Sequence, residues 1–339
     1  MRVRLHAAWL AQRTLGGLMR RVLPEELRLR QAWASYPPEL LERYLVMGHQ
    51  NPRINVQSLL LRDAIVARLF GPGFEAVMDE EIAFAIELND ALREEAARRG
   101  VRMGSYLNPW RQSRVLEVDR VIADRERRFE DRWRALLARM SAPPLRVLEL
   151  ACGSANDYRS WVAFGLAPHL AYTGIDITPA NIANARTRFP GVDFVLGSVL
   201  DLPFEDRAFD LVVASDILEH LSVESVDRAL SEAVRVTRDG LVLTFFNMGE
   251  GADDESHPTK LYQWNRLSRP RVEARLHEAF PSVEVVRVHR WLKRRYGFDR
   301  TFNRHAYTIV AANAPLLAWT RTGVNRSGQA ASSRAEDPG

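Results

Sequence analysis

The sequence predicts an α/β fold: a doubly wound, mostly parallel sheet with an antiparallel hairpin at one edge, preceded by an N-terminal helical region. After Pro144, short apolar runs alternate with helical stretches, which is typical of a parallel sheet covered by helices on both faces. Two later apolar runs follow each other without a full helix between them, and they indicate the edge hairpin. Before residue 140, the apolar residues recur with helical spacing.

The chain up to about residue 140 is predicted to be helical. Apolar residues within Asn55–Phe70 recur at steps of three and four residues, as on the buried face of a helix. Two further helices are expected over Asp79–Arg99 and Arg111–Met140, and a pair of prolines ends the region because proline breaks helices. We expect residues 1–140 to cover the pocket as a lid, to select the substrate or to form a homodimer interface.

Residues 141–314 are predicted to form the main domain, and residues 315–339 a disordered tail. Helical stretches such as Pro179–Arg188 and Val223–Val236 separate the predicted strands. The runs assigned to strands, the last two to the hairpin, are Arg146–Leu150, Tyr172–Ile175, Asp193–Leu196, Leu211–Ala214, Leu241–Phe245, Val283–Val288 and Ala306–Ala311. The tail is rich in Ser, Ala, Gly and Asn, and such a composition buries too little apolar surface to fold.

The composition indicates a globular protein of a reducing compartment. The chain has 339 residues and a single cysteine, Cys152, so no internal disulfide can form and we expect a cytoplasmic location. Its 47 basic and 43 acidic residues are interspersed, and no basic block with aromatics indicates nucleic-acid binding. No run reaches the ~20 apolar residues of a membrane span. For residues 1–23, a helix packed on its own domain is favoured over one lying on a membrane surface.

The run from Val147 to Asp157 is the first feature that points to a ligand. A buried strand enters a turn of small residues, and a helix follows. In a doubly wound sheet a ligand meets the backbone at such a turn, because small residues permit close approach and the helix offers free N–H groups. Glu149 precedes the turn, where a dinucleotide-binding fingerprint would be apolar and would read Gly-x-Gly-x-x-Gly. This speaks against a nicotinamide dehydrogenase.

With its preceding acid, this run resembles motif I of class I S-adenosylmethionine-dependent methyltransferases. The family usually has glycine at the first and third small positions, where this chain has Ala151 and Ala155, and Gly153 is kept. The resemblance implies that Glu149, Ala151 and Gly153 bind S-adenosyl-L-methionine as the cofactor. Both alanines are acceptable in size, but either is unfavourable if its backbone requires a positive φ angle.

Two further segments follow in the family's order and extend the resemblance. Asp176 ends the next apolar strand, and the resemblance implies that this carboxylate binds the ribose hydroxyls of the cofactor, with Ile177 beside it. Capping of the helix that follows is the alternative role for Asp176. Ser198 stands where the family commonly has an acid that contacts the adenine, and Val199 follows it. Both are expected to bind the cofactor, the serine more weakly than an acid would.

The fourth segment resembles the family's fourth strand and the loop beside the transferred methyl group. It includes Ser215 as a further expected cofactor contact. Methyl transfer needs a nucleophile held in line with the methyl carbon, and a base only if that nucleophile must lose a proton. The candidate catalytic residues are Asp216, His220 and His257. Asp216, Glu219 and His220 could also hold a divalent metal, but we expect no metal.

The sequence therefore predicts an S-adenosylmethionine-dependent methyltransferase that acts on a small molecule, with O-, N- or C-methylation left open. A natural product, a lipid-linked compound and a saccharide are all candidate acceptors. The loop after the fourth strand lacks the Asn/Asp-Pro-Pro-aromatic pattern of DNA-base methylation. The alternative is a degenerate protein of the same fold that binds a partner or acts as a scaffold without activity.

Overall fold

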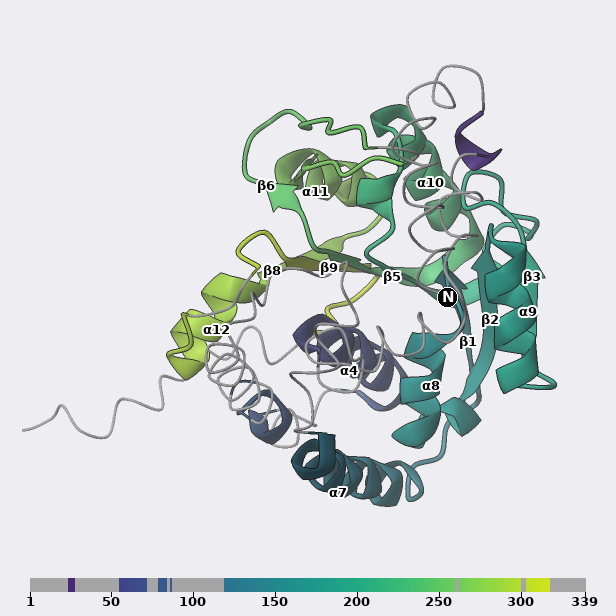
Figure 1. Cartoon of the computed structure of the whole chain (residues 1–339), viewed down its shortest axis with the longest axis vertical. Coiled ribbons are helices and arrows are strands. Elements are labelled where there is room, and N and C mark those ends of the chain that lie inside the picture. Colours follow the sequence, from purple (N-terminus) through teal and green to yellow (C-terminus); the bar gives the residue numbers. More distant parts are fainter. Residues whose placement is uncertain are drawn as a thin grey trace, which may run out of the picture.

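The computed structural model describes residues 24–27, 55–71, 79–83, 86, 119–259, 262–299 and 303–317. Its central sheet has seven strands in the order β3-β2-β1-β4-β5-β9-β8 (Figure 1). These strands are β1 (Leu145–Leu150), β2 (Leu170–Asp176), β3 (Asp193–Leu196), β4 (Phe209–Ser215), β5 (Thr237–Phe245), β8 (Ser282–Arg287) and β9 (Tyr307–Ala312). The first five are parallel, and β9 is antiparallel to both β5 and β8. The predicted doubly wound, mostly parallel sheet is confirmed.

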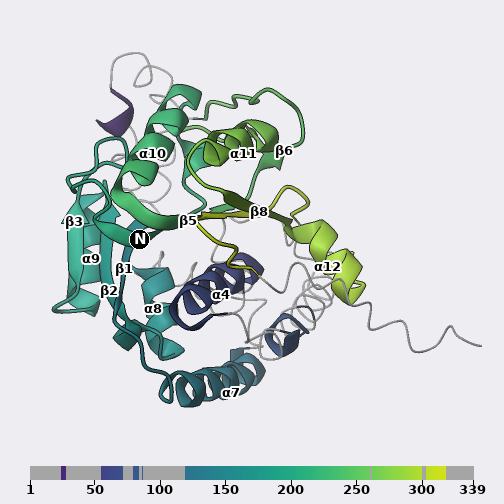
Figure 2. The same cartoon turned by 180° about the vertical axis from the view of Figure 1, so that it is seen from behind.

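Helices cover both faces of this sheet. The helices of one face include α4 (Val56–Phe70), α7 (Asp119–Leu137), α8 (Asn156–Ala163) and α9 (Pro179–Arg188), and those of the other are α10 (Val223–Val236) and α11 (Arg269–His277). Figures 1 and 2 show α4, α7 and α8 on one side of the sheet and α10 and α11 on the other. Short elements complete the order: η2 (Ala167–His169), η3 (Leu218–His220), β6 (Met248–Gly249), β7 (Leu267–Ser268) and α12 (Val288–Tyr296).

Each central strand contributes to two separate hydrophobic cores. In β4, Leu211 and Val213 belong to the core on the α4 side, whereas Val212 and Ala214 belong to the core on the α10 side. Successive side chains of a strand point to opposite faces, so a strand buried on both faces reads as a continuous apolar run. This is why the parallel strands could be recognised in the sequence.

The helix α4 is an integral part of the domain core. Leu59, Leu60 and Ile65 have no exposed surface, and the helix packs against β4, β5 and β9. At its first turn, the Gln57 side-chain amide donates hydrogen bonds of 2.9 and 3.0 Å to the carbonyl oxygens of Phe245 and Tyr307. The N-terminal region therefore covers the sheet at the ends of two neighbouring strands. Its role as a lid or dimer interface stays a prediction.

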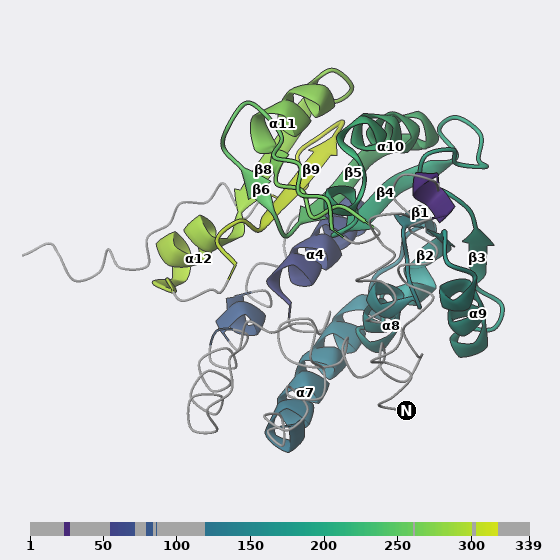
Figure 3. The ribbon, with the colours of Figure 1, turned by 45° about the horizontal axis from the view of Figure 1, so that its top comes forward.

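A buried ion pair attaches the rest of the described N-terminal region to α4. Arg62, which has no exposed surface, pairs with Glu81, and the Trp133 indole N–H donates to the same carboxylate. The Arg62 guanidinium lies 3.6 Å from the centre of the Phe164 ring. These contacts join α4, residues 79–83, α7 and the chain after α8, and Figure 3 shows α7 on the far side of α4 from the sheet.

The edge of the sheet agrees with the prediction in its pairing and differs in its connection. The strands β8 and β9 pair antiparallel, as predicted, but the expectation that no full helix lies between them was wrong, because α12 does. Of the nine residues of α12, only Val288 and Leu292 are buried, and they join the core on the α4 side. So few buried positions in a strongly basic helix leave little apolar periodicity to recognise.

Several predictions fall partly or wholly outside the described residues. The segment 1–23 and most of the predicted tail, from residue 318, are among them. Leu316 and Leu317, which the prediction assigned to the disordered tail, are instead buried in the core and donate their N–H groups to the Glu284 carboxylate. Of the predicted helix Asp79–Arg99, residues 79–83 and 86 are described, and they are helical. Within the parts of the chain that the structure describes, no helix combines the length and apolar character needed to span a membrane.

Candidate functional site

The predicted cofactor residues meet at one edge of the sheet. The strand order reverses between β1 and β4, and open α/β sheets bind ligands beyond the carboxyl ends of the strands at such a point. The turn at residues 151–155 follows β1, Asp176 ends β2, and Ser215 ends β4. Because these three strands are adjacent and parallel, segments far apart in the sequence converge on one site.

The turn after β1 has a backbone that glycine would adopt most easily. Ala151, Gly153 and Ala155 have φ angles of +52°, +54° and +62°, so both alanines occupy the left-handed region. That conformation costs a residue with a Cβ atom roughly 1–2 kcal/mol. A Cβ atom added to Gly153 would meet no atom within 4 Å, so the space above the turn is open. The positive φ angles that make an alanine unfavourable are therefore present at both Ala151 and Ala155.

Asp176 links the end of β2 to this turn. Its carboxylate accepts hydrogen bonds from the backbone N–H of Gly153 at 3.0 Å, from the N–H of Thr178 at 2.7 Å and from the Asn181 side chain at 3.3 Å. Burial raises the pKa of Asp176, and the hydrogen bond from Thr178 is the largest influence in the opposite direction. The carboxylate thus supports the start of α9 and the turn together, and it has acceptor capacity for further donors.

Glu149 lies below the turn in a buried polar cluster. Its carboxylate accepts a 2.6 Å hydrogen bond from the Tyr172 hydroxyl, and burial raises its pKa well above the usual value. Gly174 leaves room for this contact, because a Cβ atom there would lie 2.7 Å from the Tyr172 hydroxyl and 2.8 Å from the Cys152 sulfur. The thiol is buried, and burial raises its pKa well above the usual value. Cys152 is therefore a packing residue and not a reactive thiol.

The residues expected at the adenine lie beside Asp176 on β3 and its following loop. Asp176 pairs with Leu196 in the β2–β3 register, and Ile177 is half-buried at this edge. The Ser198 hydroxyl accepts a 3.2 Å hydrogen bond from the backbone N–H of Leu200, which leaves its own hydrogen available to a ligand. Val199 is 9% exposed, so it offers a small apolar surface at most.

Asp216 occupies a strained position where β4 ends. Its φ angle is +52°, which is uncommon for a residue with a side chain and often marks a functional site. Its backbone N–H donates to the Thr244 carbonyl oxygen at 3.1 Å, and its carboxylate accepts from the Thr244 hydroxyl at 3.1 Å. Burial raises the pKa of Asp216 to about 6, with repulsion from Asp157 adding to the effect. A carboxyl group with such a pKa is suited to act as a base near neutral pH.

Asp157 and Ser58 are site residues that the sequence analysis missed. The Asp157 carboxylate accepts hydrogen bonds from the hydroxyls of Ser58, on α4, and Ser215, at the end of β4. Burial raises its pKa. The only signal in the sequence was an acid in the first turn of the helix after the turn, which is also ordinary helix capping. Its partner on α4 is 99 residues away along the chain.

His220 is buried in an aromatic cluster beyond β4. Its Nδ1 lies 3.0 Å from the Gln263 carbonyl oxygen, and a carbonyl can only accept, so Nδ1 carries the hydrogen. Burial lowers the pKa of His220, which favours the neutral form of the ring. The rings of Phe246, Tyr262 and Trp264 lie within 5.1–5.5 Å of the imidazole.

His257 is exposed on the loop after β6. Its side chain is 57% exposed, and its ring lies 3.5 Å from the Glu255 carboxylate. Its backbone N–H donates to the Asn265 side chain at 3.0 Å. The carbonyl oxygen of His257 accepts a hydrogen bond from the backbone N–H of Trp264 at 2.8 Å, and the Trp264 ring contacts the His220 ring. All three catalytic candidates therefore lie at the same end of the sheet, with the His257 side chain exposed.

The side chains of Asp216, Glu219 and His220 are not arranged as a metal site. One Glu219 oxygen accepts hydrogen bonds from the backbone N–H groups of Phe246 and Asn247 at 2.7 and 3.2 Å. Across the residues that the structure describes, no group of three His, Cys, Asp or Glu side chains converges as a metal site requires. Glu219 serves instead to join the loop after β4 to the end of β5.

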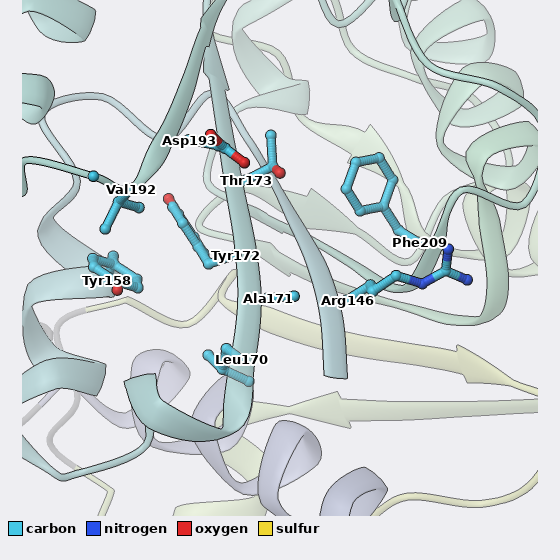
Figure 4. A pocket seen from close by; sticks show the side chains of 10 residues that line it. Arg146, Tyr158, Leu170, Ala171, Tyr172, Thr173, Val192, Asp193 and Phe209 are labelled. Atoms are coloured by element: carbon cyan, nitrogen blue, oxygen red, sulfur yellow. The ribbon is translucent and has the colours of Figure 1, made fainter. Parts of the chain in front are cut away.

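A cavity of about 420 Å³ lies elsewhere, over the amino-terminal parts of β1, β2 and β3 (Figure 4). Its lining residues include Arg146, Thr173, Asp193 and Phe209. Arg146 is the second residue of β1, and Asp193 and Phe209 begin β3 and β4. This cavity lies away from the carboxyl ends of the strands and includes none of the predicted site residues.

A comparison with protein families identifies the class of this domain. Residues 147–240 match a family model described as a methyltransferase domain. This segment contains the turn after β1, Asp176 and the loop after β4. The resemblance to class I S-adenosylmethionine-dependent methyltransferases is confirmed for this domain.

Curated relatives match over part of the chain. A phthiotriol/phenolphthiotriol dimycocerosates methyltransferase of Mycobacterium ulcerans is 40% identical over 108 residues, covering 30% of this chain and 37% of that protein. A demethylmenaquinone methyltransferase of Renibacterium salmoninarum is 33% identical over 132 residues, covering 38% and 49%. The chain thus matches about a third to a half of the length of these relatives. The solved 1,6-didemethyltoxoflavin-N1-methyltransferase of Burkholderia thailandensis has 17% identity and a TM-score of 0.38, covering 55% of this chain and 76% of that one.

Proposed function

We propose that this protein is an S-adenosylmethionine-dependent methyltransferase that acts on a small-molecule acceptor. The observation that carries the proposal is the open turn at Gly153, bonded to the Asp176 carboxylate at the switch point of the sheet. The names of the relatives support a small-molecule acceptor, since they include phthiotriol dimycocerosates and demethylmenaquinone. The single cysteine supports a cytoplasmic protein.

Each group of site residues has a role in this proposal. Asp176 accepts hydrogen bonds from the two ribose hydroxyls, which need acceptors of this kind. Ile177 and Val199 contact the adenine, with the Ser198 hydroxyl as a donor. The backbone around Ala151 and Gly153 lies against the amino-acid part of the cofactor.

The carboxylates at the end of the site suit a cationic methyl donor. When bound, S-adenosylmethionine supplies a methyl group attached to a positively charged sulfur. Burial raises the pKa values of Glu149, Asp157 and Asp216. Repulsion from neighbouring acids adds to this effect for Glu149 and Asp216. A positive charge in their midst stabilises their ionised forms. The protein orients the acceptor and excludes water, and such positioning supplies most of the rate enhancement for a good leaving group.

The arrangement of the N-terminal region leads to a second part of the proposal. Ser58, on α4, bonds the same acid as Ser215, so α4 contributes to the walls of the site. We propose that the N-terminal helical region, residues 1–140, selects the acceptor.

Calorimetric titration with S-adenosylhomocysteine tests the donor assignment. We expect binding by the wild-type protein and at least ~100-fold weaker binding by Asp176→Ala, because two hydrogen bonds to a charged group are lost. Asp176→Asn keeps one acceptor oxygen and should lie between the two. Asp193→Ala, which removes an exposed acid at the start of β3, is the matched control and should bind normally. Tight NAD binding, or no binding of S-adenosylhomocysteine by the wild-type protein, would refute the proposal.

A further inference from the structure

An aromatic cluster lies next to the strained acid at the ends of β4 and β5. It consists of Phe246, Tyr262 and Trp264 around the His220 ring. The rings of Phe246 and Trp264 are 4.6 Å apart. Asp216 adjoins this cluster because Thr244, which bonds to its backbone and carboxylate, lies two residues before Phe246.

The loop that carries two of these rings is firmly attached to the loop after β4. Asn265 is fully buried, donates its backbone N–H to the Glu219 carbonyl oxygen at 2.9 Å and its side-chain amide to the Leu221 carbonyl oxygen at 2.7 Å. The backbone N–H of Gln263 donates to the carbonyl oxygen of His220 at 3.2 Å. These bonds fix Trp264 in place between two anchored neighbours.

Trp264 is nevertheless one of the few large apolar side chains that are exposed among the described residues. It is 43% exposed, whereas His220 beside it is 8% exposed. An indole ring held this rigidly and left open offers a flat surface for another ring, and stacked aromatic pairs contribute beyond the area they bury. A rigid aromatic surface also costs little conformational entropy when a ligand binds.

The acidic side of this surface has an oxygen in need of a partner. Glu219 is fully buried, and its second carboxylate oxygen has no hydrogen-bond partner among the described residues. Burial, with repulsion from Asp216, raises the pKa of Glu219 well above the usual value.

We propose that the acceptor is an uncharged aromatic hydroxyl compound, a phenol or hydroquinol, whose ring packs on Trp264 and whose hydroxyl proton is taken by Asp216. This inference rests on the proposed methyltransferase function. As the bond from the acceptor oxygen to the methyl carbon forms, the bond from sulfur to that carbon breaks and its electron pair stays on sulfur. The hydroxyl proton ends on the Asp216 carboxylate, so charge and atoms balance.

Other acceptor classes suit this site less well. A carboxylate acceptor would meet the like charge of ionised Asp216, which repels it. An amine needs no base once it is neutral, and a neighbouring carboxylate stabilises its protonated, non-nucleophilic form. A hydroxyl is the nucleophile that a base at this position helps most.

The test follows transfer of a labelled methyl group from S-adenosylmethionine to 1-naphthol, 1,4-naphthohydroquinone, benzylamine or benzoate. We expect methylation of the first two only. With 1-naphthol, Trp264→Ala should raise KM at least ~10-fold with kcat little changed, as expected for lost stacking and burial. Asp216→Asn should lower kcat by ~100-fold or more, which is the usual contribution of a general base, and should remove the acid limb of the pH profile. Trp291→Ala, at a half-buried tryptophan on α12, is the matched control and should leave both constants unchanged.

Three results would overturn the inference: methylation of benzylamine alone, no methylation of either hydroxyl compound, or an unchanged KM in Trp264→Ala. Binding of S-adenosylhomocysteine is measured on the same preparations. If it persists, the donor assignment stands and the acceptor class alone is wrong; if it is absent, the proposed function itself fails.

Discussion

The two halves of the site differ in how their carboxylates are satisfied. On the donor side, Asp176 receives three hydrogen bonds, two of them from backbone N–H groups of the adjacent turns. On the acceptor side, Asp216 has a raised pKa of about 6 and a left-handed backbone, and one Glu219 oxygen has no partner among the described residues. The donor half is thus complete in itself, whereas the acceptor half holds buried charge that folding alone does not compensate.

The two halves also differ in how far apart in the sequence their bonded residues lie. Asp176 bonds to residues no more than 23 positions away. The acceptor half is assembled from the loop after β4, the end of β5 and residues 262–266, which lie 27 to 44 positions apart where they bond. A half built from distant segments should be more sensitive to loss of a single connecting side chain.

The largest effect should come from removing the central connection of the acceptor half. Asn265→Ala deletes a fully buried side chain and leaves the Leu221 carbonyl oxygen and the His257 N–H without their partner. The Leu221 oxygen is buried, and an unpaired buried group costs about 1–3 kcal/mol; with the cavity left by the side chain, we expect a loss of about 3 kcal/mol in the free energy of unfolding, measured by urea denaturation.

The donor half offers the matched control. Asn181 also bonds a carboxylate through its side chain, at 3.3 Å to Asp176, but it is only partly buried. Asn181→Ala should cost less than ~1 kcal/mol, because water can replace its contacts. Equal losses in the two variants would mean that the halves do not differ in this respect.

The next effect concerns the buried charge of Asp216. Its folded-state pKa of about 6 lies above the unfolded value near 3.8, so ionisation opposes folding, and the penalty is present at pH 7 and disappears as pH falls through 6 toward 4. Asp216→Asn keeps the acceptor oxygen for Thr244 and a residue type that tolerates positive φ. We expect this variant to be more stable than the wild type by about 3 kcal/mol at pH 7 and of nearly equal stability near pH 4.

Urea denaturation of both proteins across this pH range measures the difference directly, and effects common to both cancel. A stability gap that stays constant with pH would show that charge is not its source. Combined with the loss of kcat expected for the same substitution, a pH-dependent gap would mark Asp216 as a residue whose function is opposed to stability.

The sequence predicted the parts of this molecule that depend on local patterns. The buried strands read as apolar runs, and the turn with Gly153 and Asp176 followed from a strand, a small-residue turn and a helix in order. The positive φ angles at Ala151 and Ala155 could be named as a condition but not decided, since two alanines are equally compatible with an ordinary turn.

What the sequence could not predict depends on contacts between distant segments. Tyr172 bonds Glu149 only because β1 and β2 are neighbours and Gly174 leaves space. Ser58 meets Asp157 only because α4 packs across the sheet. The helix α12 was missed for a related reason. Its few buried residues form no recognisable pattern in the sequence, and they are buried only because of the surface on which they pack.

The smallest effect tests whether the donor half, complete in its hydrogen bonds, still holds backbone strain. Ala151→Gly and Ala155→Gly relieve a left-handed conformation worth roughly 1–2 kcal/mol, offset by the greater freedom of glycine in the unfolded chain. Each should raise the free energy of unfolding by about 0.5–1 kcal/mol. Ala183→Gly, at an exposed position inside α9, should lower it by about 1 kcal/mol, because glycine disfavours a helix. If all three variants lost stability alike, strain at the turn would be refuted. If the turn variants gained stability while Ala183→Gly lost it, the backbone at Ala151 and Ala155 would oppose folding, although the Asp176 carboxylate beside it already accepts three hydrogen bonds.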